Sequence, residues 1–147
     1  MKYRLLVISL LFLVRVSFAT ESKINPCVVP ESAIGIGMIE AMDQDMRIDI
    51  QTLQKDKTKV TLLSNTTVSE RLAEQFAITD EKKSTNSWLS VKDYKKIYLE
   101  DNARNLIIKY DFVNKEDKHN IFIVSALVND KECSVRFNDY LIASRGF

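Results

Sequence analysis

The sequence predicts an α+β domain in which N-terminal helices pack on a C-terminal antiparallel β-meander of three or four strands. Apolar residues recur at helical spacing in the first two-thirds of the chain. The last third holds three runs rich in strand-forming residues, separated by short polar segments. With 46% hydrophobic residues, three glycines and two prolines, the composition is that of a folded domain.

The first residues have the pattern of a secretory signal. Lys2 and Arg4 give a positive start, and residues 5–14 are apolar except for one serine. Small residues then stand at the two positions of the segment 17–19 that a signal peptidase reads, which predicts cleavage after Ala19. The alternative is a membrane anchor, but the apolar run is half of the about 20 residues that a spanning helix needs.

Two segments follow from this interpretation, a signal peptide at 1–19 and a single globular α+β domain at 20–147. Lys2, Arg4 and Arg15 are the charged residues of the first segment, so its removal changes the net charge from +1 to −2. A near-neutral domain gives no reason to expect nucleic acid as a partner. We also expect no stable membrane insertion after processing.

Cys27 and Cys133 are the two cysteines of the chain. An even number in an exported protein predicts one disulfide, with two separately buried thiols as the alternative. Closing a loop of about 100 residues stabilises a fold by up to roughly 4.7 kcal/mol in the chain-entropy model.

Residues 32–54 carry two competing patterns. One helical face is formed at spacings of three and four by Ile39, Met42, Met46, Ile50 and Leu53. Strand-like alternation is also present, for example at Ile34, Ile36 and Met38. Because strands are seldom so long, we predict a helix over most of the segment.

The next segments predict a strand, a helix and a loop. Residues 58–63 are rich in Thr, Val and Leu, which indicates a short strand. Thr67 and Glu70 have the spacing of a capping box, which predicts a helix over 68–78. The polar residues 79–87 are expected to form a loop.

Ser90 and Asp93 form a second predicted capping box, and the helix that it starts is expected to end near Asn102. Trp88 precedes this helix, and it could cluster with Tyr94, Tyr98 and Tyr140. Aromatic residues are favoured at the centres of interfaces. The preferred interpretation is that these four complete the core.

Three strands are predicted in the last third, at 106–113, 120–129 and 133–142. A two-residue turn at Asp130-Lys131 would pair Val128 with Cys133 and Ala126 with Val135. The disulfide would then pin the N-terminal segment onto the sheet. Helices followed by a curved meander are similar to cystatin-like and NTF2-like architectures, which is an analogy of fold and implies no function.

No catalytic, cofactor or metal motif is found. His119 is the one histidine and is expected in a solvated hairpin loop, without the acid and nucleophile of a triad. Asp43, Asp45 and Asp49 lack the glycine and closing glutamate of a calcium loop and are expected to face solvent. Asn65 begins an N-glycosylation sequon, whose use the sequence does not decide.

These exclusions lead to a hypothesis of function. We expect an exported, periplasmic, non-enzymatic protein that acts by binding another protein, as an inhibitor or immunity protein does; an extracellular location is the alternative. A small-ligand or lipid carrier is the second hypothesis, and it requires a pocket of about 300 Å³ or more. A secreted hydrolase that uses the carboxylates of Asp43, Asp45 and Asp49 is the third.

Overall fold

The computed structural model describes residues 25–85 and 88–147, so the predicted signal peptide and its cleavage site lie outside the described residues. Its helices and strands follow in this order: α1 (Ala33–Gln44), the short 3-10 helices η1 (Ile50–Thr52) and η2 (Lys55–Lys57), β1 (Lys59–Thr67), α2 (Glu70–Lys83), α3 (Val91–Ile97), β2 (Arg104–Val113), β3 (His119–Val128) and β4 (Arg136–Arg145). The α+β class is confirmed.

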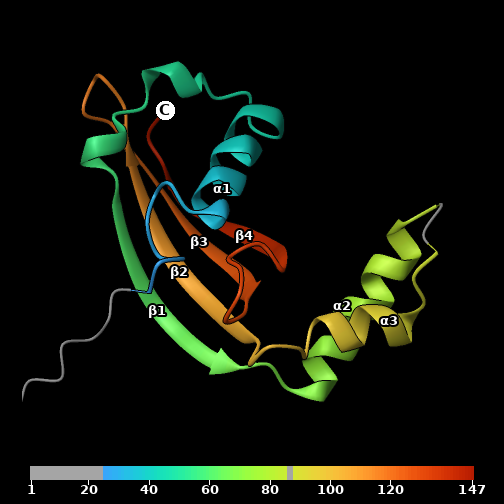
Figure 1. Ribbon diagram of the computed structural model, residues 1–147. Coiled ribbons are helices and arrows are strands. Elements are labelled where there is room, and N and C mark those ends of the chain that lie inside the picture. The colour runs from blue at the N-terminus through green and yellow to red at the C-terminus, as the bar shows by residue number, and fades with distance from the viewer. Residues whose placement is uncertain (1–24, 86–87) are drawn as a thin grey trace, which may run out of the picture.

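The four strands form one antiparallel sheet in the order β1-β2-β3-β4, which is a meander. The sheet curves around α1, which lies on its concave face (Figure 1). Apolar residues of α1 and of alternate positions on β2 and β3 fill the space between them. The buried members of this core are Cys27, Ile34, Met38, Met42, Ile48, Leu106, Ile108, Tyr110, Phe112, Phe122, Val124, Ala126 and Val128.

Helix α1 is shorter than the sequence predicts. The Ser32 hydroxyl caps its first turn by accepting from the Gly35 amide, and Met38 and Met42 are fully buried. The helix ends at Gln44 instead of continuing to residue 54. Arg47 adopts a left-handed conformation with a φ of 54°, which turns the chain away from the helix axis.

The predicted capping box at Thr67 and Glu70 is wrong. Strand β1 is longer than expected and takes in Thr67, whose hydroxyl accepts a hydrogen bond from Arg104 on β2. Ser69 caps α2 instead, by accepting from the Leu72 amide. Residues 79–83, expected in a loop, form the last turns of α2.

Helices α2 and α3 lie in the chain between β1 and β2, which is the order that the sequence predicts. They form a hairpin beyond one end of the sheet, apart from α1 (Figure 1). The capping box of Ser90 and Asp93 is confirmed, although α3 ends at Ile97, before Asn102. A second, smaller core joins the hairpin to the sheet; its buried members are Val68, Ala73, Ala77, Tyr98, Ala103 and Leu127.

The predicted two-residue turn between the last strands is also wrong. Strand β4 begins at Arg136, which pairs with Leu127, and Ala126 pairs with Phe137. A loop over residues 129–135 connects the strands, and the Asn129 side chain orders it by accepting from the Lys131 and Glu132 amides. Cys133 lies in this loop and not in the strand.

The predicted disulfide between Cys27 and Cys133 is confirmed. The two Cα atoms are 5.3 Å apart, across a sequence separation of 106 residues. Cys27 is buried in the main core. The bond therefore fixes both the N-terminal segment and the β3–β4 loop to the core.

Tyr110 on β2 has a hydroxyl group that is buried in the main core. Its ring is fully buried, and its hydroxyl has no hydrogen-bond partner among the described residues. Burial raises the pKa of this phenol. Because an unsatisfied buried hydroxyl costs free energy, we expect Tyr110→Phe to raise the free energy of unfolding by about 1 kcal/mol, as measured by urea denaturation.

Tyr98→Phe is the matched control, since the Tyr98 hydroxyl donates to an Asp80 carboxylate oxygen at 2.6 Å. That variant should be destabilised by about 1 kcal/mol. A Tyr110→Phe protein that unfolds at a lower urea concentration than the wild type would show that the hydroxyl is satisfied.

Candidate functional site

His119 is not the isolated loop residue that the sequence suggests. It is the first residue of β3, and its Nδ1 lies 2.6 Å from the Asp111 carboxylate on β2. The imidazole thus has an orienting acid, but no serine, threonine or cysteine is hydrogen-bonded to it in the described part of the chain. The geometry is that of an oriented surface pair and not of a triad.

The three acidic residues that motivated the hydrolase hypothesis are all exposed, as expected. They serve different local roles. Asp45 accepts a hydrogen bond from the Tyr140 hydroxyl at 3.1 Å, and Asp49 caps η1. Among the described residues, no group of three or more His, Cys, Asp or Glu side chains could hold a metal ion.

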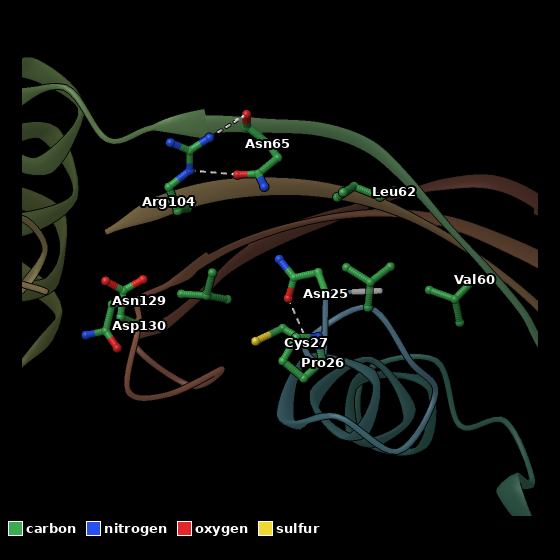
Figure 2. Close-up of a pocket in the computed structure, with 11 residues that line it drawn as sticks. Asn25, Pro26, Cys27, Val60, Leu62, Asn65, Arg104, Asn129 and Asp130 are labelled. Atoms are coloured by element: carbon green, nitrogen blue, oxygen red, sulfur yellow. Dashed lines mark hydrogen bonds between the residues drawn. The ribbon is translucent and has the colours of Figure 1, made fainter. Parts of the chain in front are cut away.

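A groove of about 800 Å³ lies on the concave side of the sheet, between the N-terminal segment and β1 (Figure 2). Pro26, Val60 and Leu62 line it together with Val28 and Val128, which gives it apolar walls. Four polar residues lie at one end, Arg104 and Asn65 on one wall and Asn129 and Asp130 on the other, whereas the polar Asn25 lies beside Pro26, as Figure 2 shows. The groove is amphipathic and partly open to solvent.

Arg104 is the cation of this groove, and β1 holds it in place. Its Nε donates to Asn65 Oδ1 at 2.8 Å, its Nη1 to Thr67 Oγ1 at 2.9 Å, and its Nη2 to the Asn65 carbonyl at 3.0 Å. A guanidinium has five N–H donors, so two remain for a ligand. The groove can therefore bind an apolar group with a polar end.

A second candidate site is the α2–α3 hairpin, which an ion pair fixes to the sheet. Arg136 on β4 donates from Nε and Nη2 to both carboxylate oxygens of Asp80 on α2, at 2.6 and 2.8 Å. The Arg136 guanidinium also lies 4.3 Å from the centre of the Phe76 ring. The hairpin thus has a defined orientation.

Asp80 and Arg136 each stabilise the charged form of the other. Hydrogen bonds from Arg136 hold the pKa of the Asp80 carboxyl below its usual range, and Asp80 in turn raises the pKa of Arg136. Burial, together with the hydrogen bond to Asp80, raises the pKa of Tyr98 well above that of a free phenol. All three groups therefore keep one charge state near neutral pH.

Trp88 lies at the tip of the hairpin, between α2 and α3, and 98% of its surface is exposed. The expectation that these four aromatic residues complete the core is therefore wrong for Trp88, but it is confirmed for Tyr94, Tyr98 and Tyr140, which pack in or against the two cores. Tyr98 is buried and stacks on Tyr94 within the hairpin, whereas Tyr140 lies on β4. An indole so exposed is unusual, because burying a large aromatic side chain is strongly favourable.

Lysines flank Trp88 at this tip, which we define as the described residues 81–85 and 88–92. Lys82 and Lys83 end α2, and Lys92 lies in the first turn of α3. None of the three is in an ion pair with another described residue. Glu81 is the one acidic residue among the described residues of the tip, so the three lysines give them a net charge of +2.

The chain matches no protein-family model, no curated protein sequence and no solved structure. Within the described ranges, no helix has the length and apolar character needed to cross a membrane.

Proposed function

We propose that this chain is an exported protein without catalytic activity that acts by binding another protein, through the tip of its α2–α3 hairpin. The observation that carries the proposal is Trp88, which is 98% exposed on a hairpin oriented by the Arg136–Asp80 pair. Tryptophan is enriched among the few residues that supply most of the binding energy of an interface. An inhibitor or an immunity protein is the class that best fits such a contact.

A protein partner is a better occupant of this tip than a lipid bilayer. One acyl chain alone gives marginal membrane binding, and stable attachment takes two signals. The tip supplies one indole and lysines worth about 1 kcal/mol each near an anionic surface. In a protein interface, by contrast, one well-packed tryptophan is enough to dominate the affinity.

The export part of the proposal rests on the N-terminal pattern and is supported by the disulfide, since disulfides persist in oxidising compartments. The periplasm is the proposed location. Intact-mass measurement of the protein purified from its producing cell should give a chain that begins at Thr20. A chain that still carries residues 1–19 would contradict export by cleavage.

The test of the binding function compares wild-type protein with Trp88→Ala as baits in periplasmic extract of the producing cell. We expect one partner to be retained at stoichiometric amounts by the wild type and lost by the variant, which should weaken binding by at least about 2 kcal/mol. Leu141→Ala removes another exposed apolar side chain, which lies on β4 and not on the hairpin, and should retain the partner. Equal retention by all three baits would contradict the proposed site.

The groove of Figure 2 supports a second candidate function, that of a carrier for a small amphipathic ligand. Its volume of about 800 Å³ lies within the range of ligand sites. If the groove carries a ligand, Leu62→Lys should abolish binding of a fluorescent fatty acid, while Leu63→Lys on the same strand should not. No binding to the wild type would exclude this class of ligand.

A further inference from the structure

A groove of about 350 Å³ lies between α1 and β4, separate from the groove of Figure 2. Its aromatic residues are Phe137 and Tyr140, and its charged residues are Glu40, Asp45 and Asp139. All the charged lining residues are thus acidic, and the described lining includes no lysine or arginine. We call this site the acidic groove.

The side chains of the acidic groove have a defined arrangement. Gly37 on α1 lets the helix approach β4, because a Cβ atom there would be 3.1 Å from the Phe137 ring. Burial and the hydrogen bond to Asp45 raise the pKa of Tyr140, so that the ring stays neutral beside the carboxylates. None of the three carboxylates forms an ion pair with a described residue.

The acidic groove and the hairpin tip are complementary in charge and in chemistry. The tip offers an exposed indole and three unpaired lysines, and the groove offers two aromatic rings and three unpaired carboxylates. Offset or edge-to-face aromatic contacts contribute about 0.5–1.5 kcal/mol beyond burial. A groove of about 350 Å³ is large enough for a small ligand group such as an indole.

Within one molecule the two surfaces do not meet. The Arg136–Asp80 pair fixes the hairpin to the sheet, and the tip stands away from α1 in Figure 1. A hairpin tip that occupies the groove must therefore belong to another molecule.

We propose that the acidic groove binds the hairpin tip of a second copy of this chain, with Trp88 of one copy between α1 and β4 of the other. Because each copy carries one tip and one groove, a two-fold pair makes both contacts at once. The proposal rests on the proposed function to the extent that both use Trp88 as the contact. The proposal identifies the partner as a second copy of this chain, and it identifies the acidic groove as the surface that the hairpin tip contacts.

The experiment is sedimentation equilibrium of the disulfide-bonded mature protein, alone and as variants. Wild-type protein should self-associate, less so as salt is raised, since the contact includes exposed charges. Trp88→Ala should weaken association at least about thirtyfold, the equivalent of 2 kcal/mol. The groove variant Glu40→Lys/Asp139→Lys should do the same, whereas the control Glu31→Lys/Asp56→Lys should associate like the wild type.

Mixing the two defective variants is the decisive step. Trp88→Ala retains an intact groove and the groove variant retains an intact tip, so an equimolar mixture should form mixed pairs through one contact. Urea midpoints equal to that of the wild type, measured at a protein concentration too low for self-association, would establish that both variants are folded. Mixed association that neither variant shows alone would establish the contact.

A monomeric wild type, undiminished association of Trp88→Ala, or a mixture that stays monomeric would overturn the proposal. A monomeric protein that still retains a Trp88-dependent partner from extract would leave the proposed function standing without this inference. Self-association with no partner retained from extract would leave this inference standing without the proposed function.

Discussion

Replacing Cys27 and Cys133 together by alanine is expected to lower the free energy of unfolding by about 2–5 kcal/mol. The reason is the separation of 106 residues, which leaves the unfolded chain much freer once the bond is absent. Urea denaturation of the double variant beside the oxidised wild type measures the difference. Wild-type protein in reductant is the control and should lose a similar amount.

The loss of stability in the double variant should be concentrated in particular segments of the chain. Cys27 is buried in the main core, and Cys133 holds the loop 129–135 beside it. Amide hydrogen exchange in the double variant should therefore increase most in residues 25–30 and in that loop. Equal midpoints for the oxidised wild type and the variant would contradict the proposed role of the bond.

Removing the Asp80 carboxylate is the second change with a large expected effect. Asp80→Asn should lower the free energy of unfolding by about 2–3 kcal/mol, because Arg136 stays largely buried, at 10% side-chain exposure, without its counter-charge. The value is below that of a fully buried pair, since 19% of the Asp80 side chain is exposed. Asp117→Asn at the exposed Lys57–Asp117 pair is the control and should change stability little.

The pH dependence of this pair has a definite sign. Because Arg136 lowers the pKa of Asp80 in the folded state, the pair stabilises the protein fully above the unfolded pKa of about 3.9. That contribution is lost as the pH falls through the lower, folded pKa. The stability difference between wild type and Asp80→Asn should therefore shrink on acidification below about pH 4 and stay constant from pH 5 to 7.

The fold was predictable where a local pattern decides the structure. The β-rich runs predicted β2 and β3 to within two residues at each end, because strand-forming residues and polar separators are local signals. The Ser90–Asp93 capping box was found for the same reason. The disulfide followed from counting, because two cysteines allow one pairing.

The errors arose where distant residues decide the structure. Local spacing predicts Thr67 as a helix cap, but the Thr67 hydroxyl instead accepts a hydrogen bond from Arg104 on another strand. Strand β4 was expected to begin at Cys133, but Cys133 is bonded to Cys27, 106 residues away, in a loop, and pairing with β3 begins at Arg136. Neither contact is visible in local spacing.

The candidate site was the least predictable part. Trp88 was assigned to the core because aromatic residues usually are buried, and its isolation depends on where the α2–α3 hairpin leaves the sheet. That direction is set by Asp80 and Arg136, which are 56 residues apart in the sequence. Two signals were nevertheless present: a tryptophan between two helix caps, and lysines on both sides of it.

Site-specific photo-crosslinking tests most directly the claim that this chain binds a protein through its hairpin tip. Benzoylphenylalanine would replace Trp88 in one variant and exposed Asp56 in a control, both expressed in the producing cell. Irradiation should join position 88 to one protein, giving a single adduct of discrete mass that position 56 does not give. No adduct from position 88, or the same adducts from both positions, would contradict the claim.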